Sequence, residues 1–444
     1  MSDRKAFQAW LKKRQIEDVE ALVPDMAGAA RGKLLPADKC GAGELKLPEG
    51  VFAQTVSGGY IDNEANVEDR DMILVPDITT LRTVPWFEEP TASVFVDCLD
   101  KEGSPINTSP RQVLRKILAL YETRGWAAVV APEVEFYLIN PHSDSNAEVE
   151  PPEGRLGRTE ASRQPFSIDQ MNDFDPFIID VYSFCEEQGI QIEALSQEMG
   201  PAQFEINFLH GEPVTLADHV FLFKRTVREA AIRHEMHATF LAKPMAEQAG
   251  SALHIHQSIV DLDDGSNVFS TRTGRQSKLF SSYIAGLQKY MPEALLIFAP
   301  YVNSYRRFLN SFSSPINLAW AIDNRTVGLR VPDSGPEARR VENRLAGSDV
   351  NPYLAIAATL ACGYLGMEEK LEPADPVEGS AYDIPFSLHP HIYASIDAMR
   401  NSKAMRKTLG DEFVSLYCSL KEEEYREFQS IITPWEREIL LFNV

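Results

Sequence analysis

The sequence predicts an α+β protein with a small N-terminal β-rich domain over residues 1–105 and a large domain over residues 106–444. Three observations lead to this prediction. The chain has 444 residues, which is enough for two or three ordinary domains. Strand-like and helix-like segments alternate, without an internal repeat or a low-complexity tract. A clear helix start follows a series of short strands, which places the domain boundary near residue 105. We therefore expect helices to cover one face of a mostly antiparallel sheet.

The first 105 residues predict a short helix and then several strands separated by Gly, Pro and Asp. The strand-like runs are VEALVPD (19–25), DMILVPD (71–77) and ASVFVDCL (92–99). The stretch GAARGKLL (28–35) resembles a Walker phosphate-binding loop only superficially. Its spacing is one residue short, and Leu34 stands where Ser or Thr is required. We interpret it as a strand and a turn.

The large domain begins with a predicted helix that Ser109 caps, Pro110 starts and Gly125 ends. Beyond it the sequence predicts strands and helices in alternation, with long helices after Asn351-Pro352 and after Asp411. The other expected elements are a strand at 127–138, an acidic loop at 141–174, a helix at 175–189, a strand at 202–208 and a helix at 215–234. The loop has 34 residues and is long enough to suggest a lid or a subunit contact.

Composition and charge limit the possible partners. With 44% hydrophobic and 24% charged residues the chain is typical of a soluble globular protein. It contains neither an 18-residue apolar run nor a signal-peptide core, so we expect no membrane partner and a cytoplasmic location. A net charge of −22 disfavours nucleic acid and anionic lipid, whereas cations are favoured.

The five cysteines are widely scattered and form no CxxC motif. This pattern excludes a zinc ribbon and predicts reduced, packed thiols. They are Cys40, Cys98, Cys185, Cys362 and Cys418.

Charged side chains alternate with apolar ones along two of the expected strands. In APEVEFYL (131–138) the side chains of Glu133 and Glu135 share a face with that of Tyr137, because side chains of a strand alternate between its faces. In QFEINF (203–208) Glu205 lies on the polar face, and Glu198 stands seven residues upstream. For one isolated strand, a solvent-facing sheet surface is the usual explanation.

Further segments carry the same pattern, and we expect them to be strands that line one cavity. Their polar residues are His254, His256 and Ser258 in ALHIHQS (252–258), Arg340, Glu342 and Arg344 in RRVENRL (339–345), Arg325 and Arg330 in NRTVGLRVP (324–332), and Arg306 and Arg307 in NSYRRF (303–308). If so many carboxylates and guanidinium groups line one cavity, they require a cation between the acids and an anion between the arginines.

The ligand types indicate which ions these are. Carboxylates with one or two histidines and no thiolate suit Mg²⁺ or Mn²⁺. A metal in an arginine-lined cavity indicates a phosphate ligand, because the metal ion and the guanidinium groups both neutralise the charge of a phosphoryl group during its transfer. A GxGxxG motif is absent from the sequence, so a nucleotide is expected to be held by the sheet cavity and its metals.

Several segments together resemble the glutamine synthetase superfamily over nearly the whole chain. They occur in the expected order: PEVEF, GPAQFE, FLAKP, GSALHIH, NSYRR, NRTVGLRVP, ARRVENR and NPYLAIAATLACG. The resemblance implies a β-grasp-like N-terminal domain and a catalytic domain whose curved, mostly antiparallel sheet is backed by helices. It also implies two or more Mg²⁺ or Mn²⁺ ions in each site, with ATP as co-substrate.

The resemblance implies a role for each of the charged residues. It implies that Glu135, Glu198 and Glu205 hold one metal ion, and that Glu133, His254 and Glu342 hold the second. It implies that His256, Ser258 and Arg340 contact ATP, that Arg325 and Arg330 contact its phosphates, and that Arg307, Arg344 and Gly250 surround the donor amino acid. The catalytic arginines are then Arg325, Arg307 and Arg344.

The family's reaction is a ligation in two steps. The γ-carboxylate of glutamate takes the γ-phosphoryl group of ATP, and an amine then displaces phosphate. In the family each site forms between the small domain of one subunit and the large domain of the next, so a six-subunit ring, possibly stacked to twelve subunits, is expected.

Two departures from the family pattern concern the acceptor. Ammonia-using members carry an acid in a small-domain loop and a second acid shortly after the NSYKR-like motif. Here the loop reads AQTVSGGY (53–60), and Ser313 stands at the second position beside Phe312. Asp62 or Glu64 could supply the first acid. A small cation without its two anionic partners is bound poorly. The sequence thus resembles the γ-glutamyl-amine ligases, which attach a polyamine or a monoamine to glutamate in amine catabolism.

Within this branch we expect a monoamine with an alkyl or aromatic substituent, because the acceptor stretches offer no acid for a distal ammonium group. A third departure, Ala249 and Ala252 in AGSALH, affects how the donor acid is held. Two alternatives stay open: an ordinary glutamine synthetase that uses ammonia, and an inactive scaffold or regulatory homologue.

Overall fold

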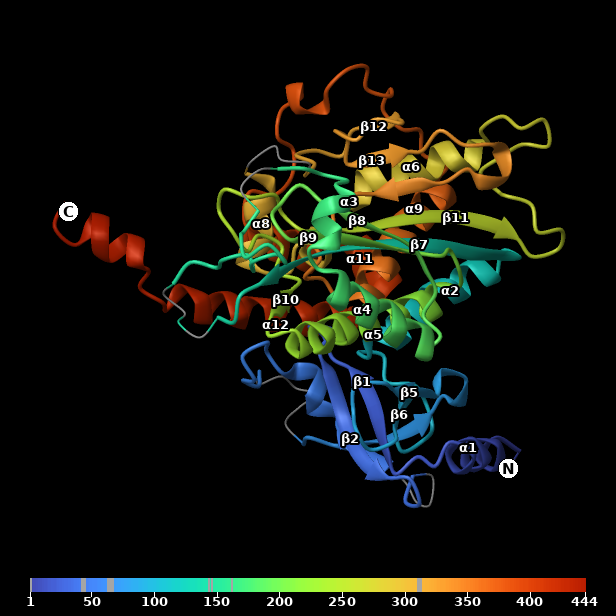
Figure 1. Ribbon diagram of the computed structural model, residues 1–444. Helices are drawn as coiled ribbons and strands as arrows, with labels where there is room; N and C mark the ends of the chain where they lie inside the picture. Colours follow the sequence, from blue (N-terminus) through green and yellow to red (C-terminus); the bar gives the residue numbers. More distant parts are fainter. Residues whose placement is uncertain are drawn as a thin grey trace.

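The chain forms two sheets that lie at different ends of the molecule (Figure 1). The computed structural model describes residues 2–40, 45–61, 68–142, 144, 147–160, 163–309 and 314–444. The first sheet has six strands in the order β2-β1-β6-β4-β3, with β5 paired to β6. Its elements are α1 (Ser2–Lys13), β1 (Asp18–Pro24), β2 (Ala30–Pro36), β3 (Leu45–Pro48), η1 (Glu49–Ala53), β4 (Asp71–Pro76), η2 (Ile78–Thr80), β5 (Arg82–Val84) and β6 (Thr91–Leu99). The predicted domain boundary near residue 105 falls between β6 and the next helix, and it stays a prediction.

The second sheet has eight strands in the order β12-β13-β14-β11-β7-β9-β8, with β10 paired to β7. Its strands are β7 (Trp126–Ile139), β8 (Ile192–Gln197), β9 (Gln203–Phe208), β10 (His237–Thr239), β11 (Leu253–Asp261), β12 (Trp320–Ile322), β13 (Leu329–Val331) and β14 (Val341–Asn343). The pair β12–β13 is parallel, and the other pairs in this sheet are antiparallel. The predicted α+β class with a mostly antiparallel sheet is confirmed.

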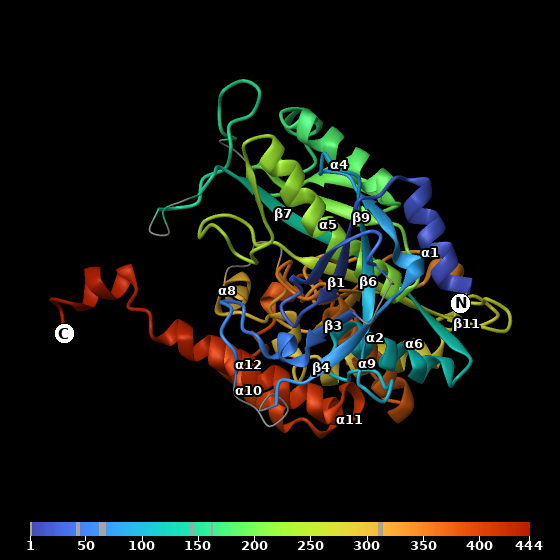
Figure 2. The ribbon, with the colours of Figure 1, turned by 90° about the horizontal axis from the view of Figure 1, so that it is seen from below.

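Helices back this sheet (Figures 1 and 2). The helices of the large unit are α2 (Pro110–Glu122), α3 (Ile168–Asn172), α4 (Asp175–Glu187), α5 (Pro213–Arg233), α6 (Lys278–Tyr290), α7 (Leu295–Phe298), α8 (Val302–Tyr305), α9 (Pro352–Glu369), α10 (Ile392–Asn401), α11 (Lys403–Leu409) and α12 (Asp411–Gln429), with short turns η3 (Arg306–Phe308), η4 (Pro336–Ala338), η5 (Ala381–Asp383) and η6 (Glu436–Leu440). Both α2 and α5 contact β7, so the apolar face of this strand is buried against helices. Its polar face is turned away from them.

Sequence signals at the helix ends explain two of these helices. Glu212 caps α5 by accepting hydrogen bonds from the backbone of Val214 and Thr215, and Pro213 occupies the first position. Asn351 caps α9 in the same way, and Pro352 follows it. The helix that we expected from Ser109 and Pro110 is α2, but the Ser109 side chain at its N-cap position forms no capping hydrogen bond within the described part of the chain.

An ion-pair network joins the small sheet to the helices below the large one. The buried guanidinium of Arg111 on α2 contacts Asp218 on α5 at 2.9 Å, and Asp77 and Asp97 of the small unit at 2.8 Å each. Arg225 on α5 forms two hydrogen bonds with Glu20 on β1, at 2.9 and 3.0 Å. One main cluster of buried apolar residues also runs through both units. The two units are therefore packed as one body, which fixes the small sheet relative to the site.

Two local predictions were wrong. The segment 303–308 was expected to be a strand, but it forms α8 and the turn η3, because Tyr305 and Phe308 pack into the core at helical spacing. Arg325 was also expected in a strand, but it lies in an exposed turn before β13. The long loop 141–174 is not wholly irregular, since α3 lies within it.

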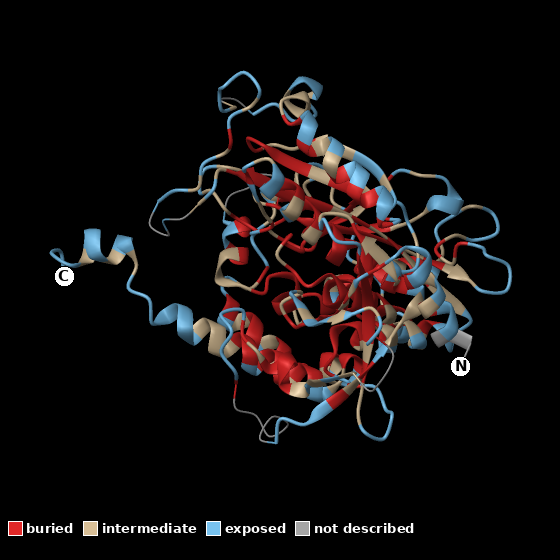
Figure 3. Ribbon diagram, turned by 60° about the horizontal axis from the view of Figure 1, so that its bottom comes forward, coloured by how far each residue is buried: buried red, intermediate tan, exposed pale blue. Residues whose placement is uncertain are grey.

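Two further predictions are confirmed. The Walker-like stretch consists of the end of a turn and most of β2. All five cysteines are buried and free. Among the described residues no helix is long and apolar enough to cross a membrane. Figure 3 shows that buried residues fill the large unit, whereas the segment after α12 projects away from it and is exposed.

Candidate active site

The antiparallel register brings the charged residues of four strands onto one face of the large sheet. Glu135 on β7 lies directly opposite Glu205 on β9. Glu133, two residues earlier, lies opposite His254 on β11. His256 in turn lies opposite Glu342 on β14. Because residues opposite one another point to the same face, these side chains form a continuous band across the sheet.

Arg330 extends the band by one strand, and Glu198 closes its other end. Arg330 on β13 is paired with Glu342. Glu198 directly follows β8, and its backbone N–H donates to the carbonyl of Gln203 at 2.7 Å. The polar faces that alternation predicted separately therefore meet in one place.

Three groups of residues in this band could hold a metal ion. In each group the ligand atoms lie within 4.8 Å of one another. The groups are Glu135, Glu198 and Glu205; Glu133, Glu205 and His254; and Glu133, His256 and Glu342. Carboxylate oxygens with at most one imidazole nitrogen per group are donors that suit Mg²⁺ or Mn²⁺.

The first group is the set that the resemblance implied for one metal ion. The second implied set, Glu133, His254 and Glu342, is also brought together. The Nδ1 atom of His254 lies 3.4 Å from Glu133 and 3.9 Å from Glu342, and it has no hydrogen-bond partner among the described residues. His256, which we expected at the nucleotide, lies as close to the acids, since its Nε2 is 3.1 Å from Glu133. The assignment of these residues as metal ligands stays a prediction.

Crowded carboxylates change the proton affinity of the band. Burial, together with repulsion from Glu205, raises the pKa of Glu135 to about 7. Burial and repulsion from Glu135 and Glu205 raise the pKa of Glu198 to about 8. Burial and Arg344 oppose protonation of His254, but Glu133, Glu205 and Glu135 raise its pKa to about 10. Without a divalent cation, protons supply the positive charge that the acids need.

These shifts predict proton-coupled metal binding. As pH rises from 6 to 8, the folded protein without metal binds more protons than the unfolded chain, on Glu135 up to about pH 7, on Glu198 up to about pH 8 and on His254 above about pH 6.5, so its stability falls. A bound metal must displace these protons, and its affinity is expected to rise by about tenfold per pH unit for each proton displaced. The Tm increase caused by a fixed concentration of Mn²⁺ should therefore be larger at pH 8 than at pH 6. Differential scanning fluorimetry measures it, and a pH-independent increase would contradict the prediction.

The predicted donor-acid residues are also adjacent. Gly250 has no room for a side chain, because a Cβ atom there would come within 2.6 Å of the Arg307 side chain and 2.8 Å of the Ala242 carbonyl. Arg307 is buried and donates to the carbonyl of Leu345 at 3.0 Å. Arg344 is buried and paired with Glu342. Gly250 and Arg307 are thus in direct contact.

Each arginine of the band keeps one unused donor. The Nε atoms of Arg307, Arg330 and Arg344 are buried, and none of them has a hydrogen-bond partner among the described residues. Unpaired buried donors are costly unless a ligand satisfies them. Carboxylates and phosphates are the anions that guanidinium groups bind best.

A cavity of about 690 Å³ lies beside the band and is lined by three of the residues predicted to contact ATP, His256, Ser258 and Arg340. Glu133 and Asn207 also line it. Arg340 Nε lies 3.3 Å from His256 Nδ1 and can fix the orientation of that ring. A nucleotide-sized space thus adjoins the predicted metal ligands.

Sequence reasoning assigned no role to two residues of the site. Gln203 donates to the carbonyl of Gly250 at 3.1 Å and lies 3.4 Å from Glu135, so it links the two predicted binding regions. Asn207 donates to Glu205 at 3.2 Å. Both residues share the polar face of QFEINF with Glu205, and this alternation was the signal that could have identified them.

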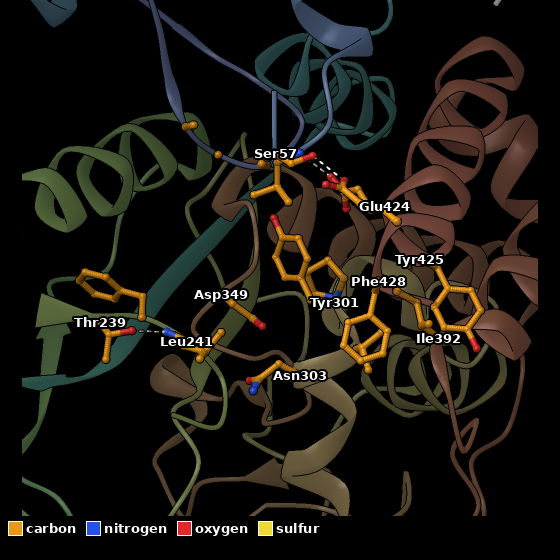
Figure 4. Close-up of a pocket in the computed structure, with 18 of the residues that line it drawn as sticks. Ser57, Thr239, Leu241, Tyr301, Asn303, Asp349, Ile392, Glu424, Tyr425 and Phe428 are labelled. Atoms are coloured by element: carbon orange, nitrogen blue, oxygen red, sulfur yellow. Dashed lines mark hydrogen bonds between the residues drawn. The ribbon is translucent and has the colours of Figure 1, made fainter. Parts of the chain in front are cut away.

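The loop 53–60, which the resemblance places at an acceptor site, does not reach the charged band of its own chain. The backbone N–H of Val56 donates to Glu424 on α12 at 2.8 Å, and the hydroxyl of Ser57 donates to Glu427 at 2.5 Å. This loop borders a second cavity, of about 800 Å³. Figure 4 shows Ser57 and Glu424 facing each other at one end of it, with Tyr301 and Phe428 further along. No predicted metal ligand lines this cavity within the described part of the chain.

The second acceptor position lies outside the described residues. It comprises Ser313 and its neighbour Phe312. Asp62 and Glu64, which could supply the acid of the small-domain loop, lie outside the described residues as well. Arg325 is described, and it is exposed.

Comparison with known proteins gives a consistent result. The family model for the catalytic domain of glutamine synthetase matches residues 107–440. The chain is 35% identical over 442 residues to a glutamate–isopropylamine ligase of a Pseudomonas species, covering 96% of this chain and 95% of that protein. It is 34% identical over 436 residues to the γ-glutamylputrescine synthetase PuuA of Escherichia coli (strain K12), covering 96% and 92%. A solved structure of GmaS without ligand has a TM-score of 0.85 at 26% identity, covering 98% of this chain and 99% of that one.

Proposed function

Because this chain belongs to the glutamine synthetase family, we propose that it is an ATP-dependent ligase that joins the γ-carboxylate of glutamate to a primary amine. The observation that carries the proposal is the band of acids beside buried arginines with unused donors. Its relatives over nearly the whole chain include ligases named for isopropylamine and putrescine. Amine catabolism in the cytoplasm is the proposed setting.

The proposed reaction has two steps. A γ-carboxylate oxygen of glutamate forms a bond to the γ-phosphorus of ATP, and the bond to ADP breaks. The amine nitrogen then attacks the acyl carbon, inorganic phosphate leaves, and the nitrogen releases its excess protons to the solvent. Phosphorylation is needed because a free carboxylate is a poor electrophile with no leaving group.

Residues of this chain divide the work as follows. Glu135, Glu198 and Glu205 would hold one divalent cation, and Glu133, His254 and Glu342 the other, with Mg²⁺ or Mn²⁺ as the ion. When bound, these ions neutralise charge on the oxygens of the transferred phosphoryl group.

The arginines and the two cavity residues orient the substrates. Arg307, with its unused Nε beside Gly250, is suited to a carboxylate of glutamate. His256 and Arg340 line the cavity of about 690 Å³ and are suited to ATP. Arg330 and Arg344 hold Glu342 in place from two sides.

Phosphate release tests the proposal directly. The purified protein is given ATP, glutamate and Mg²⁺ or Mn²⁺, together with ammonium, putrescine or an alkyl monoamine in turn. We expect a monoamine to give the largest kcat/KM and ammonium the smallest, since ammonium has no apolar surface to bury. If ammonium is the best acceptor, the chain is an ordinary glutamine synthetase, and if no acceptor supports phosphate release, it is an inactive homologue. A putrescine preference would favour the polyamine branch over the monoamine proposal.

We also propose a closed ring of six subunits, single or stacked to twelve. The attachment of loop 53–60 to α12, and not to the charged band of its own chain, supports a site completed by a neighbouring copy. Head-to-tail contacts generate a ring when the rotation closes. A monomer or dimer in light scattering under active conditions would contradict the ring.

A further inference from the structure

The segment 163–167 is attached to the candidate active site at both of its ends. At one end the guanidinium Nη2 of Arg163 donates to the carbonyl of Glu247 at 2.8 Å, three residues before Gly250. At the other end the backbone N–H of Phe166 donates to the carbonyl of Gln197 at 2.9 Å, next to Glu198. The segment therefore runs from the predicted donor-acid region to a predicted metal ligand.

The base of this segment is held firmly. Gln197 is fully buried, and its side-chain amide donates to the carboxylate of Glu160 at 3.2 Å and to the carbonyl of Gly200 at 3.2 Å. The same Glu160 carboxylate accepts a hydrogen bond from the backbone of Ala202 at 3.2 Å. Ser167 then caps α3, which contacts β8 (Figure 1). The turn that carries Glu198 and the loop that carries Phe166 thus share one hydrogen-bond network.

Phe166 itself has two unusual properties. Its backbone adopts φ +66°, the left-handed region that bulky residues rarely occupy. Its side chain is 65% exposed, so the ring gains little burial from its own chain. A strained backbone and an exposed aromatic ring at the same residue are not explained by the stability of the fold, and such residues cluster at ligand sites.

We propose that Phe166 determines acceptor specificity by contacting the alkyl substituent of the amine. This inference rests on the proposed function. The amine nitrogen must approach the acyl carbon beside the acids, and Glu198 is the acid whose neighbour is hydrogen-bonded to Phe166. The cavity assigned to the nucleotide is lined by His256, Ser258 and Arg340 together with residues of β7, β8 and β9, and no described residue of the segment 163–167 lines it. Of the three substrates, only the amine combines a charged nitrogen with an apolar substituent that an aromatic ring can bury.

A series of amines of increasing length provides the test. We would measure kcat/KM for methylamine, ethylamine, n-propylamine and n-butylamine by phosphate release at saturating ATP and glutamate. Burial of one methylene against a ring is expected to raise kcat/KM by about two- to fourfold. In Phe166→Ala this dependence on chain length should nearly disappear, whereas the rate with methylamine should change by less than about threefold. Phe166→Leu should restore part of the dependence.

Two matched variants control for a general effect of the loop. Leu156 and Ile168 flank Phe166 in the sequence and are exposed to a similar extent, 77% and 64%. Leu156→Ala and Ile168→Ala should keep the chain-length dependence of the wild type. If these variants abolish the chain-length dependence as Phe166→Ala does, the inference is wrong. It is also wrong if Phe166→Ala changes the mass in light scattering, because the Phe166 side chain then has another role.

The inference and the proposed function fail in different ways. If the wild type releases phosphate with amines but chain length has the same effect in Phe166→Ala, only the inference is wrong. If no amine supports phosphate release by the wild type, the proposed function itself is wrong.

Discussion

Glu205→Ala is expected to lower kcat by about 10³-fold or more, since it removes a carboxylate from two of the three candidate metal groups. No other residue in the first two groups belongs to both. Its loss leaves each of them with two side-chain ligands. Because positive charge beside the transferred phosphoryl group is the main contribution expected from this site, the phosphorylation step should be affected most.

The same change should leave the fold almost unaffected. Glu205 is partly exposed, and its charge raises the pKa of both Glu135 and Glu198 by repulsion. Removing it relieves that repulsion, so the free energy of unfolding without metal should change by less than about 1 kcal/mol. Phosphate release and urea unfolding measure the two effects. Glu186→Ala, an exposed glutamate on α4, is the control that should alter neither. Near-normal turnover in Glu205→Ala would refute the metal assignment.

Glu342→Ala is expected to lose activity and stability together. The side chain is 1% exposed and is paired with Arg330 at 2.9 Å and with Arg344. Burial raises the pKa of Glu342, but Arg344, His256 and His254 outweigh this effect and lower the pKa to about 2. Removing one partner of a buried ion pair leaves an uncompensated charge and typically costs about 3–5 kcal/mol. The effect on stability could not be expected from the sequence, because alternation does not show how deeply Glu342 lies.

Glu342→Gln separates the two contributions. It keeps the volume and hydrogen-bond acceptor but removes the charge, so it should recover part of the lost stability while turnover stays low by at least about 10²-fold. Urea unfolding without metal gives the free energy of unfolding, and phosphate release gives kcat. If Glu342→Ala unfolds like the wild type, the ion pairs with Arg330 and Arg344 do not exist in solution.

Much of the site was determined by sequence alone. Alternation along 131–138, 203–208 and 252–258 placed the acids and histidines on one face of each strand, because the side-chain period of a strand is two residues. The absence of thiolates and the excess of carboxylates indicated a hard divalent cation. Motif order along the chain then gave the family, and with it the fold class.

Only the tertiary structure decided how these faces meet. Register sets Glu135 opposite Glu205 and His256 opposite Glu342, and register depends on pairing between strands that are far apart in the sequence. The helical form of 303–308 was also not evident locally, since the segment is too short for helical and strand periodicity to be distinguished.

Depth and long-range attachment were the other features that sequence could not supply. The full burial of Glu342, the contact of loop 53–60 with α12 and the left-handed backbone of Phe166 all depend on residues many positions away. A local pattern predicts on which face of a strand a side chain lies, because the direction of the side chain follows from backbone geometry within a few residues. What covers that face is determined by packing between distant segments, and packing exists only in the folded chain.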